Sequence, residues 1–515
     1  MSSGVSVYLT DARPMTTKAV QIKMVIAAAA IPIERELKFI MPSLSRLILS
    51  TALLCGASVH SQNLPPEIDA ALSRTRIPRD AVSLYVIDAN PSVTTPILTH
   101  RALVAMNPAS VMKLVTTVAA LDLLGPAYTW QTQVLTDGSI KDGVLNGDLI
   151  IKGGGDPKLV AERLWLLLHR VRGLGISTIN GNIVLDSSAF SVPAINPAAF
   201  DGEPTRPYNA SPDALLVNYK SVVMTFTPLS GQNVAVIHYE PQLAGVDMPK
   251  TVPLVNADCS DYRGSLRSDF SEPKRFRFLG NYPRSCGERV WPIAYADPTA
   301  FADLAVRALW EGMGGKLGGI GRAGQTPAQA KPVLVFASPS LGEIIRDMNK
   351  FSNNVMAQQL FLTLSLSDKK PATFEASRAV LADWWKSKYG AIANLEMPVV
   401  ENGSGLSRIE RATSFSLAKM LQDAYAAPTM PELMASLPQS GVDGTLRRSK
   451  TQGVAHLKTG SLNNVASRAG FVHSQRVGAE SKRYVLVAII NTSNTEVMGN
   501  SRALFDALVE WTAKQ

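Results

Sequence analysis

Hydrophobic residues recur at two different periods along this chain, and these periods predict helices and strands in different regions. Between residues 110 and 124 the apolar side chains have helical spacing, at Val111, Leu114, Val115, Val118 and Leu121. The spacing predicts a helix with one buried face, and Asn107-Pro108 directly before it is a helix-start signal. Helices are also expected at 65–73 and at about 497–511.

Short apolar or alternating runs predict strands in the rest of the chain. Outside the middle region we expect strands at 82–87, up to Lys458, at 469–472 and at 484–490. In the middle region we expect them at 130–135, 148–152, 181–185, 221–226 and 233–238. Because the middle region is also rich in Gly and Pro turns, we interpret it as inserted β-rich material. The run from Gly312 to Gly324 has the composition of a linker.

The region 41–61 has the parts of a secretory signal peptide. Arg46 precedes an apolar stretch, 47–57, and small residues stand before Gln62, where a signal peptidase would cut. The alternative is a core helix, but the run has no helical periodicity. We therefore expect a periplasmic protein exported by this signal peptide, and we interpret residues 1–40 as a leader or an over-extended start.

Composition excludes several classes of protein. Hydrophobic residues make up 46% of the 515, which is enough for large packed cores, so disorder of the whole chain is excluded. The formal net charge of +9 suits a polyanionic partner. Basic residues cluster only as dipeptides, such as Lys482-Arg483 and Arg447-Arg448, so we expect no nucleic-acid partner. No second long apolar run follows the signal, which predicts at most peripheral association with a membrane.

Two cysteines, Cys259 and Cys286, remain after the signal segment, which itself contains Cys55. An oxidising compartment would let them form one disulfide bond, and the prediction of export favours this pairing. Two buried free thiols are the alternative.

The candidate chemistry begins at Ser110-Val111-Met112-Lys113. A serine in the first turn of a helix and a lysine three residues later lie on one face, so a nucleophile and a base come within hydrogen-bond reach. The same S-x-x-K spacing also occurs at Ser271/Lys274, Ser367/Lys370 and Ser416/Lys419. Two further motifs follow. Ser352-Asn353-Asn354 alone could cap a helix, and Lys458-Thr459-Gly460 alone could be an exposed turn.

Together and in this order, the three motifs resemble the S-x-x-K, S-x-N and K-T-G set of penicillin-binding proteins and serine β-lactamases. The surrounding sequence resembles one family in particular, the low-molecular-mass class C penicillin-binding proteins, which are D-alanyl-D-alanine carboxypeptidases and endopeptidases. The segments that carry this resemblance are Asn107-Pro108-Ala109-Ser110, Gly153-Gly154-Gly155-Asp156-Pro157, Asn402-Gly403-Ser404-Gly405-Leu406-Ser407-Arg408, Gly441-Val442-Asp443-Gly444-Thr445-Leu446 and Lys458-Thr459-Gly460-Ser461-Leu462.

The resemblance implies a fold of the α/β (α+β) class. It consists of a serine β-lactamase/transpeptidase-like domain, which is an antiparallel sheet flanked by helices, and of inserted β-rich domains. The transpeptidase-like domain would comprise 62–127 and 331–515. The inserted β-rich domain would comprise 128–330, with a nested smaller domain at about 190–290.

The resemblance also implies catalytic roles. Ser110 would be the nucleophile and Lys113 the base that takes its proton. For this the pKa of Lys113 must be lowered by burial or by a second cation, and Lys458 would be that cation. Ser352 would relay the proton to the leaving amine, and Asn354 would orient Lys113 and the substrate amide.

Substrate binding is assigned to two further sets of residues. Around the K-T-G motif, the substrate carboxylate and carbonyl would be bound by Lys458, Thr459, Gly460 and Ser461, with backbone N–H groups of Ser110 and Ser461 as the oxyanion hole. In the resembled family an acidic and an aromatic residue of the inserted domain, with an arginine and an amide of the main domain, receive the charged end of the peptide side chain. The matches here are Asp186, Phe190, Arg408 and Asn463. Asn463 is a shorter amide than the family pattern implies, and Asp186 could instead be a turn carboxylate.

We therefore predict a secreted, penicillin-binding serine peptidase that acts on peptidoglycan stem peptides in cell-wall biogenesis, with β-lactam antibiotics as covalent inhibitors. No cofactor is expected. The six histidines lack an HExxH or other clustered spacing, so no metal site is expected either. The alternatives are a β-lactamase, for which a deacylating carboxylate is not evident, and a catalytically idle peptidoglycan-binding protein.

Overall fold

The computed structural model describes residues 64–367, 369–476, 482–494 and 498–515. The predicted signal peptide and the preceding leader lie outside these residues. Among the helices of the described part, none combines the length and the apolar character needed to cross a membrane.

One antiparallel sheet combines strands from the two ends of the chain, in the order β19-β20-β21-β1-β2. Its strands are β1 (Val82–Asp88), β2 (Leu98–His100), β19 (Ala455–Leu462), β20 (Val465–His473) and β21 (Arg483–Asn491). The N-terminal strand β1 enters the sheet by pairing with β21, from Val82↔Ile490 to Asp88↔Tyr484. The strands predicted here are confirmed with one correction. β19 does not end at Lys458 but continues to Leu462, because its ladder with β20 extends past Lys458 to the pair Leu462↔Val465.

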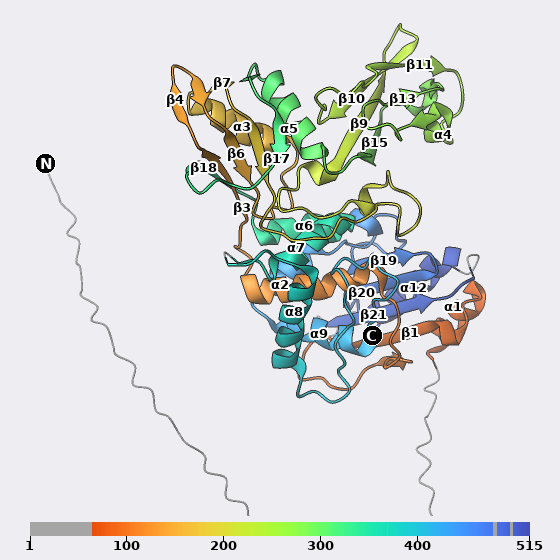
Figure 1. Cartoon of the computed structure of the whole chain (residues 1–515). Coiled ribbons are helices and arrows are strands. Elements are labelled where there is room, and N and C mark those ends of the chain that lie inside the picture. Colours follow the sequence, from red (N-terminus) through yellow and green to blue (C-terminus); the bar gives the residue numbers. More distant parts are fainter. Residues whose placement is uncertain (1–63, 368, 477–481, 495–497) are drawn as a thin grey trace, which may run out of the picture. The chain divides into compact units, whose positions relative to one another are not determined.

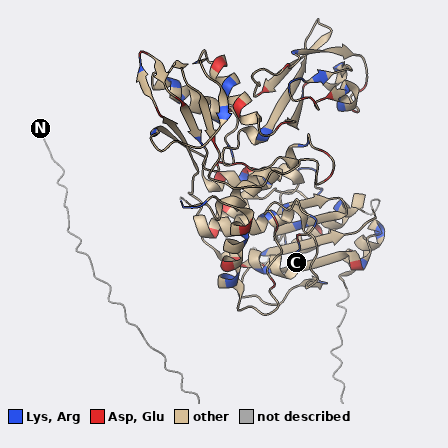
Figure 2. Cartoon of the chain, viewed as in Figure 1, with Lys and Arg blue, Asp and Glu red and all other residues tan. Residues whose placement is uncertain are grey.

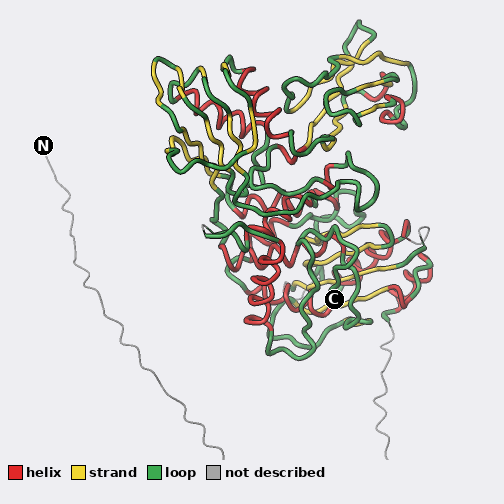
Figure 3. The backbone as a smooth tube through the Cα atoms, viewed as in Figure 1, coloured by secondary structure: helices red, strands yellow, loops and turns green. Residues whose placement is uncertain are grey.

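Both faces of this sheet are buried, which explains why its strands are nearly continuous apolar runs. In β21, Val485, Val487 and Ile489 face one core, whereas Leu486, Ala488 and Ile490 face the other. The second core is covered by α1 (Pro66–Thr75) and α12 (Ser501–Ala513). The first core is covered by α2 (Lys113–Leu124), α6 (Leu341–Phe351), α7 (Asn354–Thr363), α8 (Phe374–Tyr389), α9 (Ser414–Ala426) and α10 (Met430–Ser436). Figure 3 shows most helices gathered around this sheet.

The helix predicted at 110–124 is present, and its five periodic apolar residues are buried in the first core. Its start differs from the prediction, because a short 3-10 turn, η2 (Ala109–Met112), comes before the α-helix that begins at Lys113. The candidate nucleophile Ser110 is therefore in the tight turn rather than in the α-helix.

The middle region contains a second sheet, in the order β17-β8-β6-β3-β18. Its strands are β3 (Gln131–Thr136), β6 (Leu149–Lys152), β8 (Ile183–Asp186), β17 (Gly321–Ala323) and β18 (Lys331–Ala337). A small sheet, β16-β7-β5-β4, continues the region through β4 (Ser139–Lys141), β5 (Val144–Asn146), β7 (Thr178–Ile179) and β16 (Lys316–Leu317). Two helices, α3 (Ala161–Gly173) and α5 (Phe301–Gly312), share its core, so the region is less purely β than its sequence indicates.

Two details of this region correct the sequence analysis. Strand β18, placed by sequence in the transpeptidase-like domain, pairs with β3 from Lys331↔Thr136 to Ala337↔Gln131. The glycine-rich run after Gly312 is not a linker, because β16 and β17 within it pair with β7 and β8. Strand pairing uses backbone groups, which glycines carry as well as other residues.

A third sheet, β14-β11-β10-β9-β15, lies between residues 221 and 294. It is formed by β9 (Ser221–Pro228), β10 (Val234–Glu240), β11 (Thr251–Val255), β14 (Tyr282–Pro283) and β15 (Arg289–Ala294), next to the short pair β12 (Ser268–Asp269) and β13 (Arg277–Phe278) and the helix α4 (Tyr262–Leu266). The disulfide bond Cys259–Cys286 closes a loop of this region, with a Cα–Cα distance of 4.8 Å, so the predicted pairing is confirmed. Lys and Arg are distributed over all three regions rather than in one continuous stripe (Figure 2).

Candidate active site

Ser110 lies in a turn that two glycines allow to approach its neighbours closely. The residue before it, Ala109, has a φ of 47°, which side-chain-bearing residues rarely adopt. A Cβ on Gly405 would lie 2.1 Å from the carbonyl oxygen of Ala109, and one on Gly460 would lie 2.5 Å from that of Pro108. Since neither position has room for a side chain, the loop around Gly405 and strand β19 both pack directly against the backbone of the serine turn.

Lys113 connects this turn to two other segments. Its Nζ donates to Ser110 Oγ at 3.0 Å, to Asn354 Oδ1 at 2.7 Å and to the carbonyl oxygen of Ser404 at 2.5 Å. Lys113 is fully buried and Asn354 nearly so, whereas Ser110 is half-buried. All three acceptors are uncharged, and among the described residues Lys113 forms no salt bridge.

Lys458 makes a second set of hydrogen bonds close to the first. We call Ser110, Lys113, Asn354, Ser352 and Lys458 together the lysine cluster. Its Nζ donates to Ser352 Oγ at 2.8 Å and to the carbonyl oxygen of Thr459 at 2.8 Å. Ser352 has a left-handed φ of 58° and ends α6, while Asn353 caps α7 by accepting from the N–H of Met356. The Ser-Asn-Asn motif is therefore a helix junction whose middle residue does the capping, which leaves Ser352 and Asn354 to face the two lysines.

Burial shifts the pKa of both lysines downward. It lowers the pKa of Lys113 to about 7, and the Glu410 carboxylate partly opposes this change. Burial also lowers the pKa of Lys458 well below its usual value, with the cations Lys113 and Arg468 acting in the same direction. At neutral pH a substantial fraction of Lys113 is therefore an uncharged amine beside Ser110, which is the state that can accept the serine proton.

Glu410 is a residue of this site that the sequence did not single out. Its Oε1 accepts from the backbone N–H groups of Glu401 and Asn402 at 2.9 and 3.2 Å, and burial raises its pKa to about 7. These bonds hold the loop that presents the carbonyl of Ser404 to Lys113. The only signal near Glu410 in the sequence is the Asn402-to-Arg408 segment, in which the resemblance implies a function for Arg408 alone.

Two other contacts were also not foreseen. Asn354 Nδ2 donates to the carbonyl oxygen of Tyr208 at 3.1 Å, so a segment of the middle region reaches the lysine cluster. Thr459 Oγ1 lies 2.9 Å from Thr445 Oγ1, which connects the K-T-G strand to the Gly441-to-Leu446 segment. Gly460 and Ser461 follow on the same strand, with Ser461 exposed.

In the structure Asp186 and Phe190 make contacts within the protein. Asp186 is 1% exposed, and its oxygens accept from the N–H of Ser188 and from both the N–H and the hydroxyl of Thr326. Phe190 is buried in a small core, with its ring beside Gly155, where an added Cβ would lie 2.6 Å from it. The carboxylate therefore fixes a turn and the ring fills a core, and neither meets Arg408 in a hydrogen bond or ring contact.

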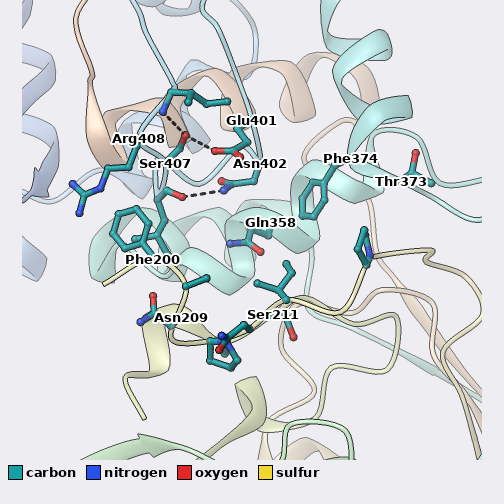
Figure 4. Close-up of a pocket in the computed structure, with 18 of the residues that line it drawn as sticks. Phe200, Asn209, Ser211, Gln358, Thr373, Phe374, Glu401, Asn402, Ser407 and Arg408 are labelled. Atoms are coloured by element: carbon teal, nitrogen blue, oxygen red, sulfur yellow. Dashed lines mark hydrogen bonds between the residues drawn. The ribbon is translucent and has the colours of Figure 1, made fainter. Parts of the chain in front are cut away.

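Arg408 and Asn463 do come together, and the aromatic partner of Arg408 is Phe200. Arg408 Nη1 donates to the carbonyl oxygen of Asn463 at 3.5 Å, and its Cζ lies 4.4 Å from the centre of the Phe200 ring. Figure 4 shows both side chains at a cavity of about 770 Å³. Its wall includes Gln358, one turn beyond Asn354 on α7, so the cavity adjoins the lysine cluster.

Within the described residues no group of three or more His, Cys, Asp or Glu side chains is placed to hold a metal ion. The serines and lysines of the site supply the hydroxyl of Ser110, the amine of Lys113 beside it, and the hydroxyl of Ser352, which accepts a hydrogen bond from Lys458.

Comparisons with known proteins identify related sequences and structures. In sequence the chain is 25% identical over 396 residues to D-alanyl-D-alanine carboxypeptidase DacB of Haemophilus influenzae, covering 75% of this chain and 81% of that protein. It is 26% identical over 443 residues to the D-alanyl-D-alanine carboxypeptidase of Actinomadura sp. strain R39, covering 82% and 81%.

In structure the chain is similar to penicillin binding protein 4 of Haemophilus influenzae. The TM-score is 0.67 at 24% identity, with 86% of this chain and 99% of the other covered. A second structure of that protein, in complex with a β-lactam, has a TM-score of 0.63 at 23% identity, with coverage of 86% and 99%. These likenesses confirm the transpeptidase-like fold.

The D-Ala-D-Ala carboxypeptidase 3 (S13) family model matches residues 64–515, which are nearly all of the described chain. The chain therefore belongs to this family and is a serine-type D-Ala-D-Ala carboxypeptidase.

Proposed function

We propose that this protein cleaves peptidoglycan stem peptides through an acyl-enzyme on Ser110, releasing terminal D-alanine and also opening peptide cross-links. The observation that carries the proposal is the contact of 3.0 Å between Ser110 Oγ and Lys113 Nζ, together with a pKa of Lys113 that burial lowers to about 7. A nucleophile beside a base that is partly neutral at physiological pH is the requirement for acyl transfer by serine.

In the first step Ser110 Oγ attacks the carbonyl carbon of the penultimate D-alanine while Lys113 takes the hydroxyl proton. A tetrahedral intermediate forms, and its oxyanion is received by the backbone N–H groups of Ser110 and Ser461. Asn354 Oδ1 and the carbonyl of Ser404 hold the amine of Lys113 in line with Ser110.

In the second step the C–N bond breaks, and the proton that Lys113 took from Ser110 passes through Ser352 to the leaving amine. The Ser352 hydroxyl accepts a hydrogen bond from Lys458. A water molecule then attacks the acyl-enzyme, the ester bond to Ser110 breaks, and the shortened peptide leaves as a carboxylic acid. The second proton of that water returns to Ser110 through Lys113, so the cycle is balanced without a cofactor.

Substrate binding divides between two sides of the cluster. The amino group of Lys458 and the hydroxyl of Thr459 are hydrogen-bond donors that suit the terminal carboxylate of the substrate, and Gly460 allows the close approach of the serine turn. The cavity with Phe200 and Arg408 suits the side chain of the residue before the D-alanines, with Arg408 toward a carboxylate at its end. Asn463 contributes its backbone carbonyl there, and Asp186 and Phe190 are not part of this proposed site.

Two supporting inferences concern sensitivity to antibiotics and cellular location. A β-lactam mimics the D-Ala-D-Ala amide, and the Haemophilus influenzae relative of the same fold binds one, which supports acylation of Ser110 by β-lactams. Peptidoglycan as substrate requires export, which fits the segment 41–61, so we propose a periplasmic location. We further propose that the sheet of β1 and β19–β21 with its helices is the catalytic domain and that the middle region is an insertion in it.

The test is to incubate the protein with a fluorescent penicillin and to map the label by intact mass and peptide sequencing, while D-alanine release from a D-Ala-D-Ala peptide is measured in parallel. We expect a slowly hydrolysed adduct on Ser110 and release of D-alanine, both absent from Ser110→Ala. Rapid penicillin hydrolysis without an adduct would support a β-lactamase instead. The matched control is Ser367→Ala, which removes the serine of another S-x-x-K pair on the surface.

A further inference from the structure

A second cavity, of about 440 Å³, is lined in part by arginines. Its charged residues are four arginines and one carboxylate: Arg447, Arg448, Arg468, Arg502 and Asp506. Phe351 and the segment from Gly444 to Ser449 complete the wall. The mechanism described above makes no use of this cavity.

The positive charge of this arginine cavity is only partly offset by the protein, because four arginines stand against the single carboxylate of Asp506. Within the described residues none of its four arginines forms a salt bridge. Asp506 accepts a hydrogen bond from Ser449 at 2.7 Å, which occupies one of its oxygens. Arg447, Arg448 and Arg502 are exposed, so their guanidinium groups are accessible to a ligand.

Arg468, which also lines the cavity, likewise has no salt-bridge partner among the described residues. It is half-buried over the ring of Phe505, at 4.8 Å, and its hydrogen bond goes to the adjacent carbonyl of Ser467. Burial lowers its pKa to about 10, with the nearby Asp506 opposing this change. A guanidinium in this position gains from an anion that enters the cavity, because the anion replaces the lost hydration.

The arginine cavity adjoins the proposed carboxylate subsite. Thr445 lines it, and its hydroxyl oxygen lies 2.9 Å from that of Thr459. Arg468 is the direct ladder partner of Thr459 between β20 and β19, so their side chains lie on the same face of the sheet. A ligand whose carboxylate reaches Thr459 can therefore continue into the cavity.

We propose that the arginine cavity binds a second carboxylate on the departing part of a cross-linked peptide. This inference rests on the proposed function. When a terminal D-alanine departs, it carries one carboxylate, which Thr459 and Lys458 can bind. When a cross-link is cut, the departing group is a whole stem peptide with further carboxylates, and guanidinium groups bind these in a paired geometry. The cavity thus favours cross-linked substrates over free pentapeptide ends.

The experiment compares the protein with the triple variant Arg447→Gln, Arg448→Gln and Arg502→Gln, which leaves half-buried Arg468 in place. Three rates are measured: cleavage of a purified cross-linked muropeptide dimer, D-alanine release from a monomeric pentapeptide, and acylation by fluorescent penicillin. We expect kcat/KM for the dimer to fall at least tenfold and the other two rates to stay within twofold. The matched control, Lys274→Gln with Arg284→Gln and Arg289→Gln, removes the same charge from exposed positions near the third sheet.

The outcomes separate this inference from the function on which it rests. Failure of the unchanged protein to form an adduct with penicillin would overturn the proposed function. If the adduct forms normally, an unchanged rate on the dimer, or an equal loss on dimer and monomer, would overturn the arginine cavity as a subsite. A loss on the dimer that the control variant reproduces would also overturn it, because general charge would then be the cause.

Discussion

Lys113 and Asp186 are both buried charged groups, but their partners differ in kind. Lys113 donates to a hydroxyl, an amide oxygen and a carbonyl, so no hydrogen-bond partner offsets its charge, and burial lowers its pKa to about 7. Asp186 accepts three hydrogen bonds, and although burial alone would raise its pKa, these bonds outweigh burial and lower it. Burial therefore does not indicate function by itself. The partners decide whether a buried charge is reactive or structural.

The largest expected effect comes from removing the amine of Lys113. Lys113→Met keeps the length of the side chain but removes the base, so we expect acylation by penicillin to slow by about 10²- to 10⁴-fold. Stopped-flow measurement with a fluorescent penicillin would show this. Lys419→Met is the control, because Lys419 belongs to another S-x-x-K pair and donates to Gln422 instead. A rate within tenfold of the original would contradict the role of Lys113.

A smaller effect is expected when the cluster gains a negative charge. The neutral amine of Lys113 is the active form, so acylation should rise with pH through about 7 in the unchanged protein. Asn354→Asp places an anion at 2.7 Å from the amine, which stabilises the ammonium and raises its pKa. We expect the rising limb of the pH profile to move upward by about one to three pH units.

The control for this prediction is the adjacent residue. Asn353→Asp adds the same charge at the cap of α7, where aspartate is equally suited to accept from the N–H of Met356. The limb should stay near pH 7 in this variant. If the pH at which acylation rises shifts equally in both variants, or shifts downward in Asn354→Asp, Lys113 does not control the pH dependence of acylation.

Asp186 should respond in the opposite way, with a loss of stability and little loss of activity. Asp186→Asn weakens hydrogen bonds to a charged acceptor, so we expect the free energy of unfolding to fall by about 1–3 kcal/mol at pH 7. Because the folded-state pKa is lowered, this stabilisation is complete above the unfolded pKa of about 4 and is lost as pH falls through the folded value. Denaturant unfolding at several pH values, beside penicillin acylation, would measure both effects.

Asp269 provides the comparison for that variant. It also accepts from the N–H and hydroxyl of a serine two residues later, but on the surface. Asp269→Asn should therefore cost less than Asp186→Asn. If Asp186→Asn raises KM only for a peptide with a free side-chain ammonium and leaves stability unchanged, Asp186 is a ligand-binding residue after all.

The sequence could predict the parts of this molecule that depend on local pattern. The apolar periodicity of α2 and the continuous runs of β1 and β21 give the elements, and the three ordered motifs indicate residues that the structure brings together around Lys113 and Lys458. Spacing contains no information on where a side chain points, so the ligand role of Asp186 and Phe190, which rests on the resemblance alone, stays a prediction. Pairings that use only backbone, such as β16 and β17 in the glycine-rich run, likewise leave little signal in residue type.

Contacts between distant segments were also beyond prediction. The carbonyl of Tyr208 meets Asn354, and Thr326 meets Asp186, although more than a hundred residues separate each pair. Such contacts depend on how the middle region folds back, and neither residue type identifies its partner. Phe200 was missed for the same reason, since a phenylalanine in a proline-rich segment has no feature that indicates an arginine at 408.

The pair Phe200 and Arg408 differs from both Lys113 and Asp186, because Arg408 is exposed and its partner is an aromatic ring. An exposed cation–π contact contributes about 0.5–1 kcal/mol. If the ring keeps Arg408 in place for a side-chain carboxylate, Phe200→Leu should raise KM by about two- to fivefold and leave kcat unchanged, because that free energy corresponds to such a factor. The measurement is D-alanine release from two peptides, one with a side-chain carboxylate and one with a lysine in its place. An equal rise in KM for both would mean that Phe200 shapes the cavity without directing Arg408.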